Sequence, residues 1–182
     1  MRKLASLAVA AAVIAAGGVA LVAARPPTRS APKGPVWTEV AWPFPADPWG
    51  SGRAFRCTAS HCGSEITVYL RAKAGLCDCT TGVADDEHLD RVGDVDLVGR
   101  ESVARGPGEP VTVHRMSGRR RAYTVRGRGA ATSVLSVAFN DRCDLVVATA
   151  IGSETGLPQE RTVLDFLNGD VVLRWTERTL GL

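Results

Sequence analysis

The chain has 182 residues, the length of one folded domain, and with 45% hydrophobic and 23% charged residues it is neither a disordered nor a collagen-like chain. Its formal charge is +3, but five of the 22 basic residues and none of the 19 acidic residues precede residue 34, so the remainder carries 17 basic and 19 acidic residues, a net charge of −2. This balance excludes a general attraction to phosphate backbones, and we expect no nucleic-acid partner.

The first 24 residues are typical of an export segment. Arg2 and Lys3 precede an uncharged apolar run of 21 residues from Leu4 to Ala24. A helix of that length would reach roughly 32 Å, enough to cross the hydrocarbon core of a bilayer. The length favours a retained inner-membrane anchor, whereas the small residues at the end of the run also suit a cleaved signal peptide. The sequence predicts export, with both fates of residues 1–24 open.

Residues 25–36 follow with four prolines, a composition typical of a linker rather than of packed structure. We expect a single exported domain over residues 37–182. Its five cysteines fit an oxidising compartment better than the cytosol, so we expect a periplasmic or other extracytoplasmic location. An uncleaved leader would anchor the domain to the inner membrane through residues 4–24.

The first part of this domain predicts a strap, a hairpin and a helix. Residues 42–50 combine tryptophan, phenylalanine and proline, and we expect them to run extended over the domain's own core rather than to serve as a ligand for a partner. Residues 66–71 alternate apolar and polar side chains, which indicates a strand with one buried face, and residues 55–57 are its expected hairpin partner. Residues 83–91 predict a short helix, because its acidic start suits the positive end of a helix dipole.

Four further strands are expected in the middle of the domain. Two of them, 111–116 and 119–126, flank Ser117-Gly118, which predicts a tight hairpin turn. The next two, 132–139 and 143–151, are nearly continuous in valine, leucine and alanine. We expect them to be central strands that are buried on both faces.

Two helices are expected to complete the chain, one with Pro158 in its first turn and one capped by Asp170. The predicted fold class is therefore α+β: an antiparallel sheet of five or six strands whose apolar face is covered by the C-terminal helices and by the 83–91 helix. The predicted core residues are Val68, Leu70, Leu135, Val137, Phe139, Leu145, Val147, Leu164, Leu167 and Trp175.

The cysteines predict two disulfides. Four of the five lie between residues 57 and 79 in the pattern C-x4-C-x14-C-x-C. Cys57 and Cys62 would sit at either end of a hairpin loop, close enough to bond. Cys77 and Cys79 are two residues apart, so a bond between them would be strained. We expect one of them to pair with Cys143 and the other to remain a free thiol.

A Zn²⁺ or Cu⁺ site is the alternative use of the same residues, because thiolates and imidazoles bind both ions. Its candidate ligands are Cys57, His61, Cys62, Cys77 and Cys79. The spacing departs from the usual pair of short Cys-x2–4-Cys motifs. The favoured interpretation is therefore disulfide bonds with no cofactor.

Several segments together resemble a family of uncharacterised exported bacterial proteins. They include the Cys-x-Cys-Thr-Thr-Gly-Val-Ala-Asp-Asp motif, and they are Trp42–Pro45, Phe55–Cys57, Cys77–Glu87, Phe139–Asp144, Leu173–Trp175 and Leu180–Leu182. The resemblance covers most of residues 37–182. It implies an exported location and an intact domain, but no chemistry, since the family has no established activity.

Two charged clusters stand out along the chain. Six carboxylates fall within twelve residues, namely Asp85, Asp86, Glu87, Asp90, Asp94 and Asp96. They lack the register of an EF-hand, so we interpret them as a solvated helix face. Six arginines fall within fourteen residues, namely Arg115, Arg119, Arg120, Arg121, Arg126 and Arg128. On a hairpin they would form a basic tip able to bind carboxylate or phosphate, although a charged sheet edge that prevents aggregation is the commoner role.

No catalytic motif is present: the sequence contains no G-x-S-x-G, H-E-x-x-H, P-loop or Rossmann glycine pattern. We therefore expect a non-catalytic, disulfide-stabilised module that holds or recognises another component of the cell envelope, either a protein or an anionic lipid surface. The alternative is a thiol-based metal-binding or redox protein that uses Cys77 and Cys79.

Overall fold

The structure is a computed structural model that describes residues 34–127, 129–152 and 159–182. The predicted export segment 1–24, the part of the predicted linker up to residue 33, Arg128 and Pro158 lie outside these residues. Among the described residues, no helix combines the length and apolar character that a membrane crossing requires.

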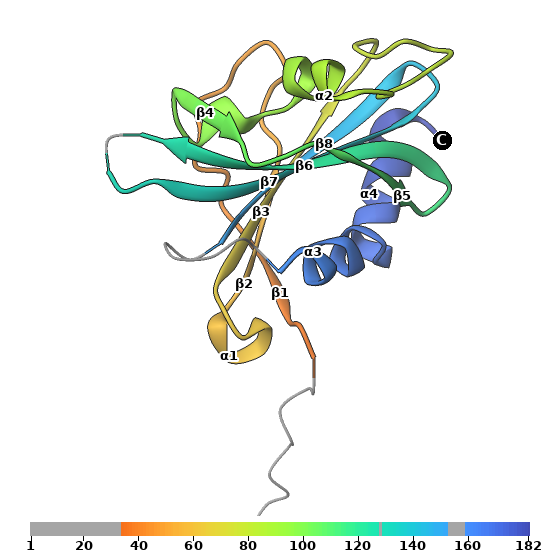
Figure 1. Cartoon of the computed structure of the whole chain (residues 1–182). Helices are drawn as coiled ribbons and strands as arrows, with labels where there is room; N and C mark the ends of the chain where they lie inside the picture. The colour runs from red at the N-terminus through yellow and green to blue at the C-terminus, as the bar shows by residue number, and fades with distance from the viewer. Residues whose placement is uncertain (1–33, 128, 153–158) are drawn as a thin grey trace, which may run out of the picture. The chain divides into compact units, whose positions relative to one another are not determined.

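Within the described residues, eight antiparallel strands form one sheet, rather than the five or six that we expected (Figure 1). The strands are β1 (Trp37–Val40), β2 (Arg53–Cys57), β3 (Ile66–Lys73), β4 (Glu101–Ala104), β5 (Glu109–Val113), β6 (Met116–Arg126), β7 (Thr132–Asp141) and β8 (Asp144–Gly152). Seven follow the order β1-β2-β3-β8-β7-β6-β4, and β5 also pairs with β6. The strands missed from the sequence, β1 and β4, are four-residue edge strands with no buried residue. A strand that buries so little has no period-two signature.

The β5–β6 hairpin turns earlier than the sequence predicts. Ser117 and Gly118 lie inside β6, and the chain turns at His114 and Arg115, with His114 at a φ of 54°. Gly118 allows close packing instead, because a Cβ atom there would lie 2.1 Å from the backbone oxygen of Ala138 on β7. A glycine that permits a close approach is indistinguishable in sequence from a turn glycine, so the predicted turn was wrong.

The helices are α1 (Ala59–Cys62), α2 (Asp86–Val92), the 3₁₀ helix η1 (Val95–Leu97), α3 (Glu160–Leu167) and α4 (Asp170–Leu180). Asp85 is the N-cap of α2, where its carboxylate accepts a hydrogen bond from the His88 N–H at 2.7 Å. We expected Asp170 to cap α4, but it does not. It is the first residue of that helix and Gly169 is the N-cap, which still places a carboxylate at the positive end of the helix dipole.

The helices cover both faces of the sheet, which corrects the expectation that all of them share one face (Figure 1). Phe139 of β7 packs in one apolar cluster with Phe166 and Leu167 of α3. Its neighbour Ala138 points to the opposite face and packs in another cluster with Leu89 of α2. Successive residues of a strand point to opposite faces, so the continuous apolar runs of β7 and β8 require cover on both sides.

The core agrees with the sequence prediction at most positions. The predicted core residues on β3, β7 and β8 are buried, as is Leu167. Leu164 and Trp175 are only partly buried and pack against the edge of the core. Both lie on the two C-terminal helices, where the outer part of the apolar stripe remains in contact with solvent.

The aromatic strap lies against the domain itself, as predicted. The rings of Trp42 and Phe44 meet the ring of Tyr69 edge to face, with centroids 5.9 and 4.8 Å away. Tyr69 belongs to β3 and alternates with the core residues Val68 and Leu70. The strap therefore covers the same sheet face as α2 and leaves the other face to α3 and α4.

Candidate functional site

Both predicted disulfides are confirmed. Cys57 is bonded to Cys62, and Cys79 is bonded to Cys143. Cys77 is the free cysteine and is 7% exposed. Its burial, together with the nearby carboxylate of Asp144, raises the pKa of the Cys77 thiol above the ordinary value. A buried thiol of this kind is protonated at neutral pH.

The structure does not bring the predicted metal ligands together. Three of them, Cys57, His61 and Cys62, come just before the first residue of β3, Ile66. The other two, Cys77 and Cys79, come after its last residue, Lys73, and so lie at the opposite end of the strand. Four of the five cysteine sulfurs are bonded in two pairs, as disulfides. Within the described ranges, no group of three His, Cys, Asp or Glu side chains is placed to hold a metal ion.

Three of the predicted interaction arginines have acidic partners within the domain. Arg119 donates to Asp86 at 2.5 Å and Arg121 donates to Asp90 at 2.9 Å. Arg120 donates to Glu109 at 2.6 Å and also pairs with Glu160. Asp86 and Asp90 of the acidic cluster are therefore partners of Arg119 and Arg121 across α2 and β6, whereas Arg120 pairs with acids outside that cluster. This corrects the expectation that these three arginines form a basic tip open to a ligand.

The acidic cluster has structural roles beyond a solvated helix face. The backbone N–H of Gly108 and the guanidinium of Arg119 hold the pKa of Asp86 below its ordinary value. Asp94 is 3% exposed and belongs to an ion cluster that the sequence analysis missed. The period-two pattern of β3 carried its only signal: Arg71 and Lys73 lie two residues apart and so share a face.

This ion cluster joins β3 to the segment after α2. The carboxylate of Asp94 accepts from the Arg71 guanidinium at 2.8 and 2.5 Å, and lies 2.7 Å from Lys73 Nζ. Arg71 also pairs with Asp47 of the strap. A pocket of about 390 Å³ opens beside the cluster, with Trp49 at 38% exposure on its lining. Because these charges satisfy one another, the cluster is primarily a structural element that fastens the strap and η1 to the sheet.

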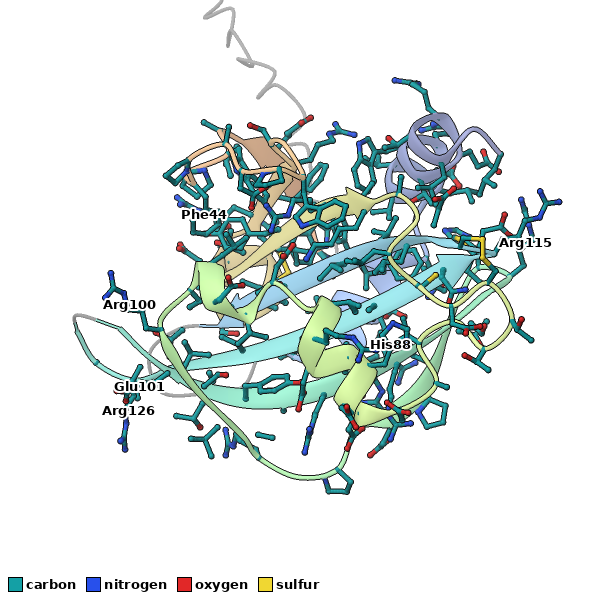
Figure 2. All side chains as sticks on the ribbon, turned by 90° about the horizontal axis from the view of Figure 1, so that it is seen from above. Phe44, His88, Arg100, Glu101, Arg115 and Arg126 are labelled. Carbon is teal, nitrogen blue, oxygen red and sulfur yellow. A yellow bond between two sulfur atoms is a disulfide. The ribbon has the colours of Figure 1, made fainter. Side chains whose placement is uncertain are left out.

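The remaining predicted arginines lie apart from each other. Arg115 is at the β5–β6 turn, 4.0 Å from Glu177, with a side chain that is 67% exposed. Arg126 ends β6 at the opposite end of the sheet, where Figure 2 shows it beside Glu101, with the Arg100 side chain farther away and pointing in another direction. Arg128 lies outside the described residues. The six arginines therefore do not form one basic tip.

Arg126 and Arg100 line a pocket of about 590 Å³ between β4 and the end of β6. Its other lining residues are Val98, Gly99, Glu101, Gly127, Gly129 and Ala131. Neither arginine has a carboxylate within 4.0 Å among the described residues, although Glu101 pairs with Arg126 in the strand ladder. The described lining thus includes two arginine residues and one glutamate.

Sequence reasoning named Arg126 but not Arg100. Arg100 lies 26 residues earlier, and the β4–β6 ladder brings Glu101, the residue after it, opposite Arg126. That ladder depends on a four-residue edge strand with no sequence signature.

No family model, curated protein or solved structure matches this chain.

Proposed function

We propose that this protein is a non-catalytic module of the cell envelope that binds an anionic group of another envelope component through the Arg100–Arg126 pocket. The charged start and apolar run of the leader support export through the inner membrane. The two disulfides are compatible with an oxidising compartment such as the periplasm. The proline-rich residues 25–36 would hold the folded domain away from the membrane if the leader is retained.

The observation that carries this proposal is the contrast between two sets of arginines. Arg119, Arg120 and Arg121 already bind carboxylates of the same domain, so a ligand would have to displace these partners. Arg100 and Arg126 have no such partner among the described residues and line a pocket. An anion entering this pocket would gain charge-assisted hydrogen bonds without breaking an existing ion pair.

The pocket fits a ligand group that carries several anionic oxygens. The planar guanidinium of arginine matches the geometry of carboxylate and phosphate oxygens. Gly127 and Gly129 present backbone without side chains, which lets an anion approach the main chain closely. Phospholipid headgroups and acidic protein side chains both supply this chemistry.

A binding experiment tests the pocket. Binding of the full-length protein is measured to an acidic peptide and, separately, to anionic vesicles relative to zwitterionic ones, so that attachment through the leader cancels. Combined Arg100→Ala and Arg126→Ala substitution should weaken binding of the true ligand at least tenfold, because a hydrogen bond to a charged group contributes about 1.5–3 kcal/mol. Glu101→Gln should tighten the same interaction, because it removes a negative charge from the lining.

The matched control removes the same charge elsewhere. Arg161 and Arg178 are exposed on α3 and α4, and their combined replacement by alanine should leave binding unchanged. A response in the vesicle arm alone identifies a lipid headgroup, and a response in the peptide arm alone identifies a protein partner. Equal weakening by both double variants, or no binding in either arm, would contradict the pocket proposal.

Export makes a separate prediction about the mature N-terminus. Mass spectrometry of the protein from its native cells should find it outside the cytosol with both disulfides formed. A chain that begins at Met1 in the membrane fraction would establish the retained anchor, and one that begins at Arg25 would establish a cleaved signal peptide. Recovery of the chain only from the cytosol, with reduced thiols, would refute export.

A thiol-based redox function is favoured by one observation, the free Cys77 two residues before a disulfide-bonded cysteine. Thiols that catalyse redox reactions usually have a lowered pKa and an accessible sulfur. Cys77 has neither, because it is buried and its pKa is raised. The envelope-binding function is therefore the better supported of the two.

A further inference from the structure

Three cysteines meet where the loop after β3 reaches the turn between β7 and β8. The backbone N–H of Cys77 donates to the carbonyl oxygen of Cys143 at 3.3 Å. The Cys77 thiol donates to the carbonyl oxygen of Arg142 at 3.2 Å. Cys79 is bonded to Cys143. The free Cys77 and the Cys79–Cys143 disulfide therefore lie next to the same turn, the one between β7 and β8.

The loop is held against this turn by contacts that do not involve sulfur. The N–H of Gly75 donates to the Asp144 carboxylate at 2.7 Å, on one side of the cysteines. The N–H of Val83 donates to the Asn140 side chain at 3.3 Å, on the other side. These contacts would keep the loop docked if the covalent link moved from one cysteine to another.

We propose that Cys77, Cys79 and Cys143 form an internal thiol–disulfide exchange centre. In this exchange the Cys77 thiolate attacks Sγ of Cys143, a Cys77–Cys143 bond forms, and the Cys79–Cys143 bond breaks. Cys79 leaves as a thiolate and takes up the proton that Cys77 gave to solvent. One disulfide and one thiol are present before and after the step, so it needs no external oxidant or reductant.

The cross-link itself has little preference between the two isomers. The present bond joins residues 64 apart, and the exchanged bond would join residues 66 apart. Because the entropy of loop closure depends only logarithmically on loop length, both bonds restrict the unfolded chain almost equally. Local packing therefore decides which isomer predominates.

The isomers differ in where the free thiol lies. Cys77 is buried, whereas Cys79 is exposed. Exchange would therefore convert a protected thiol into one that a partner thiol or an alkylating reagent can reach. The raised pKa of Cys77 keeps the attacking thiolate scarce at neutral pH, so the exchange should accelerate as the pH rises. Exchange would give this domain a site for covalent attachment, independently of the anion pocket.

Alkylation of the oxidised full-length protein under native conditions tests the exchange. The protein is incubated with N-ethylmaleimide at pH 7 and pH 9, digested without reduction, and analysed by mass spectrometry. Fragmentation on either side of Asp78 locates the label and the cross-link. We expect label on Cys79 in peptides whose cross-link joins Cys77 to Cys143, with several-fold faster labelling at pH 9.

Two variants and an internal control sharpen this result. Cys77→Ser should abolish labelling of Cys79 and leave the Cys79–Cys143 bond intact. Cys79→Ser should fold with a Cys77–Cys143 bond and no free thiol. The Cys57–Cys62 bond must stay unlabelled, which distinguishes local exchange from general scrambling. Label on Cys77 alone, with Cys79–Cys143 unchanged in the folded wild-type protein, would overturn the proposal even if a variant fails to fold.

Discussion

Replacing Asp94 by alanine should lower the free energy of unfolding by about 3–5 kcal/mol, the range observed when one partner of a buried ion pair is removed. The Asp94 carboxylate lies between Arg71 and Lys73, and all three side chains are nearly inaccessible to solvent. Without it, Lys73 keeps its hydrogen bond to the carbonyl oxygen of Val92 at 2.7 Å, with its Nζ 5.8 Å from the centre of the Trp49 ring. Arg71 keeps its ion pair with the partly exposed Asp47 and its contact with the Trp42 ring. Two buried positive charges would then repel each other.

Urea denaturation followed by far-UV circular dichroism measures this change. Glu65→Ala is the matched control, because it removes a carboxylate 3.8 Å from Arg56 at an exposed pair. That substitution should change the free energy of unfolding by no more than about 1 kcal/mol. If Asp94→Ala were as mild as Glu65→Ala, the ion cluster would not fasten η1 and the strap to the sheet.

Cys143→Ser should lower the free energy of unfolding by about 4 kcal/mol on the chain-entropy model. The lost bond closes a long loop between residues 64 apart. The same model gives about 2 kcal/mol for Cys57→Ser, whose partner is only five residues away. In guanidinium denaturation of the oxidised variants, Cys143→Ser should therefore have a lower denaturation midpoint than Cys57→Ser.

Cys79→Ser distinguishes a Cys143 bond that requires Cys79 from one that can exchange to Cys77. If Cys77 takes over the bond to Cys143, this variant should lose much less stability than Cys143→Ser. Equal losses for the two variants would show that the cross-link requires Cys79. A smaller loss for Cys143→Ser than for Cys57→Ser would contradict the dependence on loop length.

The sequence was informative where a local pattern was sufficient. Strand β3 followed from side-chain periodicity, β7 and β8 from continuous apolar runs, and helices α2 to α4 from signals near their N-termini; most of the core followed with them. The Cys57–Cys62 bond followed from spacing, because these cysteines flank a short loop. Spacing also indicated that Cys77 and Cys79 do not bond to each other, but it left open which of them pairs with Cys143.

Only the tertiary structure decided which charges are paired. The acidic and basic clusters are separate blocks in the sequence, yet α2 packs beside β6 and neutralises Arg119 and Arg121 with Asp86 and Asp90. Ion pairing depends on distances of a few ångströms between segments some 30 residues apart, and no local pattern carries that information.

The candidate pocket is likewise formed by segments that are far apart in the chain. Arg126 belonged to the predicted cluster, but Arg100 comes beside it only through the pairing of β4 with β6. Composition and local residue patterns thus determined the fold class and most of the core, because these depend on neighbours in the chain, and cysteine spacing indicated the Cys57–Cys62 bond. Only the folded chain decided that Cys79, rather than Cys77, pairs with Cys143 across 64 residues. The sheet edges, the assignment of helices to the two sheet faces and the arginines without acidic partners depend on long-range pairing, which only the folded chain establishes.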